Sequence, residues 1–409
     1  MLITHLNHQL RERDALALTR QRRIAESASA PHQRLTQGTQ PARDLLTFCS
    51  NDYLGLSNHP TLIDAIAEGA RRYGAGSGAS HLINGHSRAH VLLEEALANC
   101  LAPCIPQARA VTFCTGYMAN MALLTSLGDA KATLFSDQLN HASLIDGTRL
   151  AKATVQRYAH CNLTDLASQL AACATPIKLI VTDAVFSMDG DLADLGALLA
   201  LAERFDAWLI VDDAHGFGVL GAQGRGSLSH FGLCSERLIY MGTLGKAAGL
   251  GGAFVAAHPS IVEWLIQTAR PYIYTTAAPP SIAHALLASL TLIQSDEGEQ
   301  RRQHLQTLIG HLRQQLQILL KRHPALGWTL TDSLTAIQGL VVGDNTTALA
   351  LSSQLDACGL TVPAIRPPTV PVGTSRLRIT LSAAHTVADI DQLMTALTAV
   401  AQTLESTPP

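Results

Sequence analysis

Short, almost continuously apolar runs alternate with helical stretches between about residues 93 and 255, and this alternation restricts the fold more than any other feature. The runs are RAVTFC (109–114), ATLFSD (132–137), IKLIVTDAVF (177–186), AWLIVDDA (207–214), RLIYMG (237–242) and GGAFVAA (251–257). Segments between them, such as LTDLASQLAACA and LGALLALAERF, have the pattern of helices. Apolar, β-branched runs separated by helices indicate buried parallel strands with right-handed crossovers. The sequence therefore predicts an α/β fold with a mainly parallel sheet.

The chain changes character at about Pro280, where two long helical segments are followed by strands such as LTAIQGLVVGD and SRLRITLS. We expect three parts: an N-terminal helix and connecting segment at 1–50, a large cofactor-binding α/β domain at 51–290, and a small C-terminal α+β domain at 291–409. Leu2, Leu6 and Leu10 follow helical spacing. The N-terminal helix is therefore expected to lie with an apolar side on the body of the protein.

Composition excludes several classes of protein. With 47% hydrophobic and 15% charged residues over 409 positions, the chain is typical of a folded globular protein. A net charge of −3 and the lack of a basic stripe argue against nucleic-acid binding. The eight cysteines contain no Cys-x-x-Cys pair, which disfavours a zinc ribbon and fits a reducing compartment. No stretch has the length of a membrane span, so we expect a soluble, cytoplasmic protein.

Reactive side chains follow the predicted strands at their carboxyl ends, where ligands bind in parallel α/β sheets. In chain order they are Gly116 and Tyr117, His141, Ser187, Asp212 and His215, and Thr243 and Lys246. Each has an ordinary structural explanation when taken alone, such as a tight turn at Gly116. Asp212, His215 and His141 also leave a zinc site open as a weaker alternative, because zinc takes three or four such ligands. We expect no metal, because the whole set fits another chemistry better.

Lys246 stands in the glycine-rich run GTLGKAAGLGG and decides between two kinds of phosphate chemistry. A P-loop requires a glycine five residues before Gly245 and a hydroxyl residue after the lysine, but Tyr240 and Ala247 occupy those positions. The alternative is a lysine that carries pyridoxal 5′-phosphate (PLP) in covalent linkage. PLP requires a lysine of lowered pKa, a buried carboxylate beside the ring nitrogen, and amides at a helix N-terminus for the phosphate. The strand-end residues supply each of these groups.

With these positions assembled, the sequence resembles the α-oxoamine synthases, a branch of the fold-type-I PLP-dependent enzymes. The resemblance runs from about Phe48 to Leu393 and is carried by FCSNDYLGLSNHP, GAGSGASHLINGHS, DQLNHASLIDG, VFSMDGDLADL, VDDAHGFGVLG, GTLGKAAGLGGAFV and AIRPPTVPVGTSRLRITLSAAH. It implies a large domain with a mainly parallel sheet and a smaller α+β domain. It also implies a homodimer with active sites at the subunit interface.

The resemblance implies a role for each matching residue. Lys246, His141 and Asp212 would be catalytic: Lys246 forms the Schiff base, His141 stacks on the cofactor ring and Asp212 pairs with its nitrogen. Further cofactor contacts would come from Gly116, Tyr117, Ser187, His215 and Thr243, with Thr275 or Thr276 reaching the phosphate of the neighbouring subunit. Substrate contacts would come from Arg20, Asn51, His141, Thr369 and Arg378. Arg22 and Arg23 follow closely on Arg20, so the N-terminal arginine stays open.

Within the family, AIRPPTVPVGTSRLR and SNDYLG resemble the branch that serves biotin synthesis. That branch joins L-alanine to a pimeloyl thioester, carried by coenzyme A or acyl carrier protein, and releases carbon dioxide and the thiol. Two alternatives remain open from the sequence. One is a sister enzyme such as 2-amino-3-ketobutyrate CoA ligase, and the other is a non-catalytic partner subunit, which the presence of Lys246 disfavours.

Overall fold

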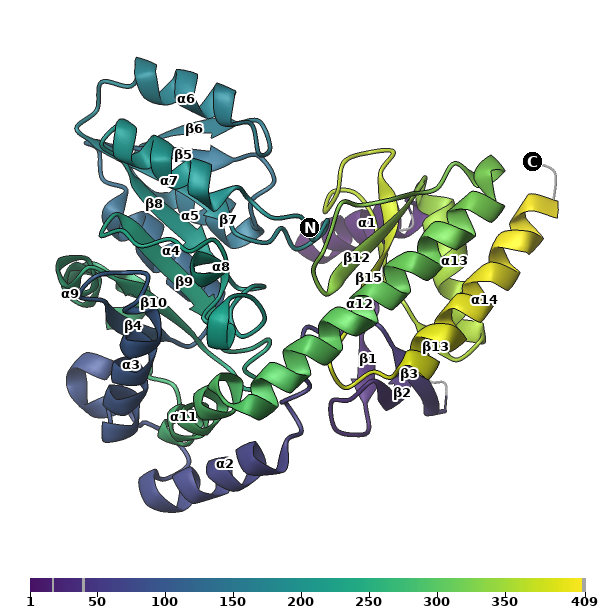
Figure 1. Cartoon of the computed structure of the whole chain (residues 1–409), viewed down its shortest axis with the longest axis horizontal. Helices are drawn as coiled ribbons and strands as arrows, with labels where there is room; N and C mark the ends of the chain where they lie inside the picture. Colours follow the sequence, from purple (N-terminus) through teal and green to yellow (C-terminus); the bar gives the residue numbers. More distant parts are fainter. Residues whose placement is uncertain (17, 39–40, 407–409) are drawn as a thin grey trace.

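The computed structural model describes residues 1–16, 18–38 and 41–406, and it is built around a seven-stranded sheet (Figure 1). The strand order is β4 (Arg109–Phe113), β10 (Ala253–Ala257), β9 (Leu238–Thr243), β8 (Trp208–Asp212), β7 (Ile177–Asp183), β5 (Ala132–Asp137) and β6 (Thr154–Tyr158). Strands β9, β8, β7 and β5 pair in parallel, as predicted, and β6 extends this parallel arrangement at the edge of the sheet. The α/β fold class is confirmed.

Two strands differ from the prediction. The run at 251–257 forms a strand, but β10 is antiparallel to both of its neighbours, β4 and β9. The connection from β9 is too short for a crossover, because a parallel pair needs a dozen or more intervening residues. Strand β6 was not predicted at all. It is the edge strand and is partly exposed, so it lacks the continuous apolar run that marks the central strands.

Helices cover both faces of this sheet, so its strands are buried on two sides. On β8, Leu209 and Val211 join one apolar core while Ile210 joins the other, and all three are fully buried. The elements that precede and surround the sheet are α2 (Pro60–Tyr73), the π-helix His81–Gly85, α3 (Arg88–Leu101), α4 (Gly116–Leu127), α5 (Ala142–Leu150), α6 (Leu163–Ala172), α7 (Leu195–Arg204), the 3-10 turn Ala222–Gly224, α8 (Ser227–His230), α9 (Pro259–Thr268), α10 (Arg270–Ile273) and α11 (Pro280–Gln294). Burial on both faces explains why the strands read as unbroken apolar runs.

The long helix α12 (Asp296–Arg322) connects this part to a second, smaller sheet, as Figure 1 shows. The smaller sheet has the order β11, β12, β15, β14 and is antiparallel throughout. The elements of this C-terminal part are the 3-10 turn Pro324–Leu326, β11 (Thr329–Leu330), β12 (Ile337–Gly343), α13 (Asn345–Ala357), β13 (Leu360–Thr361), β14 (Ala364–Ile365), β15 (Ser375–Thr380) and α14 (Val387–Ser406), of which β13 belongs to a separate sheet with β3. Strand β15 carries Arg378 and directs it towards the large sheet through a bond to the Ser187 backbone.

The N-terminal segment contains more structure than the predicted helix. Helix α1 (Leu2–Ala15) is present, but none of its residues is buried, and Leu6 and Leu10 are 45% and 61% exposed. The prediction that it packs on the body of its own chain is therefore wrong. Three strands follow: β1 (Arg23–Ala25), β2 (His32–Gln37) and β3 (Arg43–Thr47). Strand β3 pairs in parallel with β13, so the beginning of the chain joins the C-terminal part. No helix in the described part of the chain is long and apolar enough to cross a membrane.

Candidate active site

A cavity of about 180 Å³ opens at the carboxyl ends of the central strands. Seven of the residues predicted from the sequence line it: Gly116, Tyr117, His141, Asp212, His215, Thr243 and Lys246. Five more lining residues were not predicted: Asn120, Ser143, Asp183, Ala214 and Met241. The parallel sheet thus brings together side chains from five different strand ends, although they are spread over 130 positions of sequence, from 116 to 246.

Lys246 lies in the connection between β9 and β10, which bends sharply. Gly249 and Gly252 adopt φ values of +72° and +109°, and a side chain on Gly249 would come within 2.7 Å of the backbone of Leu56. Only glycine adopts such conformations without strain. The ammonium nitrogen Nζ of Lys246 lies 2.7 Å from His215 Nε2. The bend thus presents one amine to the cavity on a strip of small residues.

The environment of Lys246 makes its amine easier to deprotonate. Burial lowers its pKa to about 8, helped by the guanidinium of Arg378 and opposed by the carboxylates of Asp212 and Asp183. An amine must be neutral to act as a nucleophile or base. At pH 7 a lysine with a pKa near 8 is neutral in roughly one molecule in ten, several hundred times more often than one with the usual value near 10.4. The site therefore prepares Lys246 for covalent and proton-transfer chemistry.

Asp212 ends β8, is 4% exposed, and receives two hydrogen bonds. Asn120 Nδ2, on helix α4, donates to one carboxylate oxygen at 2.7 Å, and the backbone N–H of Ala214 donates to the other at 3.0 Å. Donors of this kind favour the charged form of a carboxylate. Asn120 also donates to Ser143 Oγ at 2.9 Å, which fixes its amide plane. The site therefore holds a buried carboxylate whose orientation is fixed through both of its oxygens.

His141 caps helix α5 and is held from two sides. Its backbone N–H donates to Asp183 at 2.6 Å, and its Nδ1 accepts from the N–H of Ser143 at 3.2 Å. Burial lowers the pKa of the His141 imidazole, with the charge of Asp212 opposing and that of Lys246 adding to the effect. Burial also raises the pKa of Asp183 well above its usual range, and the nearby charge of Asp212 adds to the effect. His141 therefore presents a neutral ring to the cavity.

Helix α4 begins at Gly116 and directs its first amides to the same cavity. Thr115 caps this helix by accepting from the N–H of Met118 at 3.2 Å, and the Thr243 hydroxyl lies 3.8 Å from where a side chain on Gly116 would stand. The first amides of a helix lack partners within the helix and bind anions such as phosphate. Tyr117 is 45% exposed, and its hydroxyl donates to Asp146. Gly116 and Thr243 thus lie together at one corner of the cavity, at the N-terminus of α4.

Arg378 and Asn51, both predicted to contact substrate, lie next to each other. Arg378 is 6% exposed, and its Nε donates to the backbone oxygen of Ser187 at 2.6 Å. Its Nη1 donates to Thr380 Oγ1 at 2.9 Å and its Nη2 to Asn51 Oδ1 at 3.3 Å. A guanidinium fixed in this way is suited to a carboxylate ligand. Ser187 takes part through its backbone oxygen, and it is not among the residues that line the cavity of Lys246.

Four predicted contacts lie away from this cavity in the single chain. Thr369 is exposed on a turn, where its N–H donates to the backbone oxygen of Arg366 at 3.1 Å. Arg20 is also exposed. Arg23, one of its two alternatives, donates to Thr361 Oγ1 and pairs with Asp356, both at 2.8 Å. The remaining two, Thr275 and Thr276, line a small adjoining space with Cys114 and Met118.

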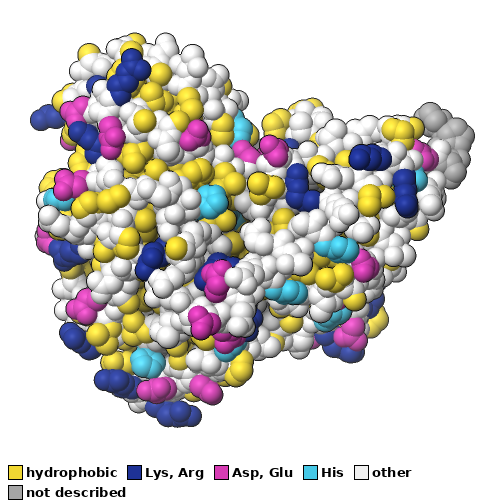
Figure 2. All heavy atoms as spheres, in the orientation of Figure 1, with side chains coloured by type: hydrophobic (Ala, Val, Ile, Leu, Met, Phe, Trp, Pro, Cys, Tyr) yellow, Lys and Arg dark blue, Asp and Glu magenta, His cyan; other side chains and the backbone are white. Residues whose placement is uncertain are grey.

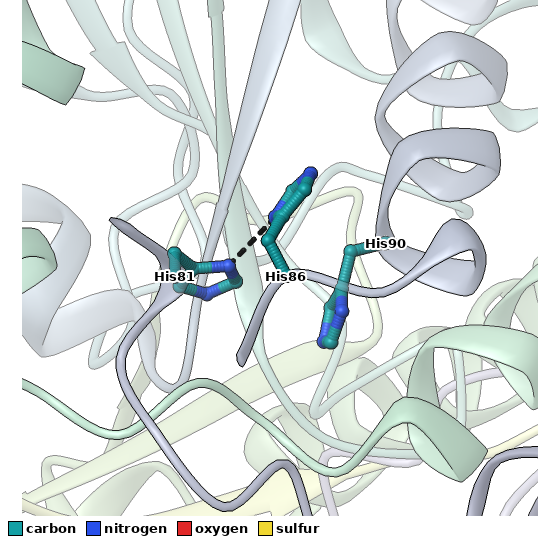
Figure 3. A group of neighbouring side chains, drawn as sticks. All are labelled: His81, His86 and His90. Atoms are coloured by element: carbon teal, nitrogen blue, oxygen red, sulfur yellow. Dashed lines mark hydrogen bonds between the residues drawn. The ribbon is translucent and has the colours of Figure 1, made fainter. Parts of the chain in front are cut away.

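Two side-chain groups in the described part of the chain are dense enough to consider as metal ligands, and both lie outside the Lys246 cavity. Figure 3 shows the first, in which His81 Nδ1 and His86 Nδ1 are 2.8 Å apart. His90 uses both nitrogens structurally: Nδ1 accepts from the Ser87 N–H at 3.0 Å, and Nε2 faces the Ala278 oxygen at 2.9 Å. The lone pair of His90 Nδ1 thus caps helix α3 and is not available to a metal ion. Only His81 and His86 of this group remain as ligands, and zinc takes three or four.

The second group contains His160, which lies 3.0 Å from Asp137 and 2.9 Å from Asp191. Although burial opposes it, hydrogen bonds to these two carboxylates raise the pKa of His160 to about 12. The imidazole is therefore a cation held between two acids rather than a neutral metal ligand. It ties the end of β5 to the loop that precedes α7.

Comparison with known proteins places this site in a family. The model of the family described as aminotransferase class I and II matches residues 43–397. An 8-amino-7-oxononanoate synthase 2 from Polaromonas sp. (strain JS666) is 74% identical over 404 residues, which cover 99% of this chain and 100% of the relative. The chain belongs to the 8-amino-7-oxononanoate synthases, within the class I and II aminotransferase family. It is therefore a PLP-dependent acyltransferase, and the predicted family, enzyme class and cofactor are confirmed.

Solved structures of related enzymes share the fold. A high-resolution structure of SPT with PLP as an internal aldimine has a TM-score of 0.89 at 28% identity, with 100% of both chains covered. The 8-amino-7-oxononanoate synthase from Francisella tularensis has a TM-score of 0.71 at 32% identity, covering 88% of this chain and 99% of that one. These likenesses extend over most or all of the chain, so the fold-type-I arrangement applies to the chain as a whole.

The side chains of this cavity fit PLP. The donor set offers one amine of lowered pKa, one buried carboxylate with its own donors, and one helix N-terminus, which match the aldehyde, ring nitrogen and phosphate of the cofactor. Asn120 Oδ1 is buried and has no hydrogen-bond partner among the described residues. A buried polar atom without a partner next to a cavity indicates that a ligand or water completes the site.

Proposed function

We propose that this enzyme condenses L-alanine with a pimeloyl thioester to give 8-amino-7-oxononanoate, carbon dioxide and the free thiol. The observation that carries the proposal is the position of Lys246. Its amine lies among Asp212, His215 and Arg378, which together with the start of α4 supply groups for the ring, the phosphate and an amino-acid carboxylate. When bound, PLP supplies an electron sink for the electron pair left on Cα after its proton is removed.

The residues of the site have separate roles in binding the cofactor, binding alanine and transferring the proton. Asp212 would pair with the ring nitrogen, and the bonds from Asn120 and Ala214 hold its carboxylate in place. When PLP is bound, the Gly116 and Tyr117 amides with the Thr243 hydroxyl would hold its phosphate, and the His141 ring would stack on the ring of the cofactor. Arg378 and Asn51 bind the carboxylate of alanine, which orients the Cα–H bond towards Lys246. Lys246, partly neutral at pH 7, takes the α-proton as general base.

The test is thiol release from pimeloyl-CoA and from pimeloyl-acyl carrier protein, with L-alanine, glycine or L-serine in parallel. We expect release with alanine and none in Lys246→Ala, while Lys131→Ala, a change at an exposed lysine outside the cavity, keeps full activity. Release with glycine in preference to alanine would reject the proposed substrate in favour of a sister reaction. Release that persists in Lys246→Ala would reject the role of the lysine.

The enzyme is also proposed to act as a homodimer in which Thr275 and Thr276 contact the phosphate of the partner subunit. Support comes from their place beside the first turn of α4 but outside the cavity of their own chain. Mixing a Lys246→Ala chain with a Thr275→Val/Thr276→Val chain should regain activity, because about a quarter of the sites would then have both parts intact. Mixtures no more active than the separate variants would refute shared sites.

We further propose that the enzyme works in the cytoplasm. All eight cysteines are free thiols, and six of them are partly or fully exposed: Cys49, Cys114, Cys161, Cys173, Cys234 and Cys358. Exposed thiols persist in compartments that glutathione and thioredoxin keep reducing. Fractionation of cells that express the tagged chain, with the membrane and periplasmic fractions as comparison, tests this location directly.

A further inference from the structure

The hydroxyl of Tyr53 lies between two groups of the site and was not among the predicted residues. Tyr53 is 1% exposed, and its Oη is 2.5 Å from His215 Nδ1 and 3.2 Å from Asn51 Oδ1. On the other side of the same imidazole, His215 Nε2 is 2.7 Å from Lys246 Nζ. Lys246, His215, Tyr53 and Asn51 therefore form one continuous row of hydrogen-bonding groups.

The number of protons in this row is limited by burial. Burial lowers the pKa of His215 well below its usual value, and the charges of Lys246 and Arg378 add to the effect. His215 is therefore a neutral imidazole with one N–H. Burial raises the pKa of Tyr53 to about 12, so the phenol keeps its proton. A neutral imidazole has one donor and one acceptor nitrogen, and its partners decide which nitrogen carries the proton.

Two arrangements satisfy every group. In the first, the Lys246 ammonium donates to Nε2, Nδ1–H donates to Tyr53 Oη, and the Tyr53 hydroxyl donates to Asn51 Oδ1. In the second, Nε2–H points into the cavity as a donor, and Nδ1 accepts from the Tyr53 hydroxyl. Tyr53 serves both because a hydroxyl donates and accepts. A phenylalanine in its place would leave the buried Nδ1 without a partner in either arrangement, which costs free energy.

We propose that Tyr53 is a positioning residue that allows His215 to change tautomer when the cofactor binds. Without cofactor, the Lys246 ammonium selects Nδ1–H. With PLP bound, the ring oxygen of the cofactor replaces the ammonium as the partner of Nε2, and Nε2–H becomes the donor while Tyr53 turns its hydroxyl to Nδ1. The inference rests on the proposed role of His215 towards the cofactor ring. It adds Tyr53 as the residue whose hydroxyl allows His215 to present Nε2–H to the cofactor.

The same rotation links the cofactor to the carboxylate-binding pair. Asn51 Oδ1 accepts from Tyr53 at 3.2 Å and from Arg378 Nη2 at 3.3 Å. When the Tyr53 hydroxyl turns to His215, Asn51 keeps Arg378 as its donor. Asn51 Oδ1 is then held by Arg378 alone, while the guanidinium stays fixed by Ser187 and Thr380, and the pair is ready for the carboxylate of the amino acid. Cofactor binding thus prepares the substrate site through one hydroxyl group.

The experiment uses the full-length enzyme with and without PLP, labelled with ¹⁵N-histidine, and Tyr53→Phe as the variant. Nitrogen chemical shifts identify the tautomer of His215, whose signals are assigned from their loss in His215→Gln. We expect Nδ1–H in the cofactor-free wild type and Nε2–H in the loaded wild type. In Tyr53→Phe we expect a mixture of both tautomers in each form. One tautomer in both forms of the wild type would overturn the proposal without reference to any variant.

A second readout is the pH midpoint of the visible absorbance change of bound PLP. A fixed N–H donor to the ring oxygen favours the deprotonated cofactor, so Tyr53→Phe should raise the midpoint by roughly 0.5–1 pH unit. Tyr158→Phe is the matched control, because Tyr158 is equally buried but lies on edge strand β6, outside the cavity. A Tyr53→Phe enzyme that melts earlier yet keeps the wild-type midpoint and tautomers would show a structural role and refute the proposal.

The outcomes also separate this inference from the proposed reaction. An intact tautomer change with no thiol release from alanine would reject the substrate and leave Tyr53 in its proposed role. Thiol release from alanine with an unchanged tautomer in every form would keep the reaction and reject the role of Tyr53.

Discussion

Replacing Asp212 by asparagine in the cofactor-free protein should make the Lys246 amine more reactive, although the same change should disable the loaded enzyme. The carboxylate of Asp212 is the strongest of the charges that stabilise the Lys246 ammonium. An opposite charge at short range shifts a pKa by roughly 1–3 units. Asparagine keeps the size of the side chain and its place at the end of β8. The charge is therefore the main property that changes.

The magnitude follows from the pKa near 8 in the wild type. At pH 7 roughly a tenth of the amines are then neutral, and a fall of one unit would bring that fraction to about a half. We therefore expect Asp212→Asn to raise the labelling rate of Lys246 at pH 7 about fivefold. Arg378→Gln should act in the opposite direction, because the guanidinium lowers the pKa of Lys246. The two variants together test the sign of the electrostatic argument.

The assay is competitive labelling of the cofactor-free protein with a limiting amount of acetic anhydride, read by mass spectrometry between pH 6 and 11. The exposed Lys131 gives an internal reference within the same chain. Asp44→Asn, a change at a carboxylate whose side chain is 81% exposed, is the matched control and should leave the rate unchanged. Equal or slower labelling of Lys246 in Asp212→Asn would refute the account of how the site activates its lysine.

Three further predictions concern stability and cofactor affinity. Lys246→Met should stabilise the cofactor-free protein by roughly 1–3 kcal/mol at pH 7, measured by urea unfolding. Because the pKa of Lys246 in the folded protein is lowered to about 8, the stability of the wild type rises between pH 8 and 10.5. The stability advantage of the variant should therefore shrink over that pH range. His160→Gln should lower the free energy of unfolding by roughly 2 kcal/mol at pH 6. Because the pKa of His160 is raised to about 12, its ion pairs to Asp137 and Asp191 stabilise the protein fully below pH 6.5 and progressively less towards pH 12. An unchanged melting temperature at pH 6 would contradict this. Thr243→Val should raise the Kd for PLP about tenfold in fluorescence titration and leave that for pyridoxal, which lacks the phosphate, unchanged.

The sequence predicted the site better where a strand ended in a reactive residue than where a helix supplied one. Asp212 and Lys246 stand next to apolar runs or glycines, so their positions are visible in one dimension. Asn120 looks like any polar residue in the middle of a helix, and its bond to Asp212 exists because α4 packs on β9 and β10, next to the end of β8. Tyr53 is likewise unremarkable in sequence, and its partner His215 is 162 positions away. Such contacts depend on tertiary packing and carry no local signal.

The errors in the fold have equally physical origins. The apolar run of β10 identified a buried strand but not its direction, which the length of the preceding connection determines. The exposed leucines of α1 show the limit of periodicity, since a pattern of apolar residues indicates a face but not what covers it. The short strand β3 pairs with β13, a segment more than 300 positions away, and no window of local sequence contains that information.

Because β3 pairs with β13, the fold can be completed only after the C-terminal part of the chain has been synthesised. Backbone bonds from Leu46 to Gly359 and from Phe48 to Thr361 join residues more than 310 positions apart. A nascent chain therefore carries an unpaired strand edge through most of its synthesis, and exposed edges invite pairing with other chains. A fragment that begins at α12 would lack the partner of β13 and should aggregate when expressed alone. Co-expression of residues 1–50 as a separate peptide should reduce this aggregation, because the peptide supplies β3 as the pairing partner of β13.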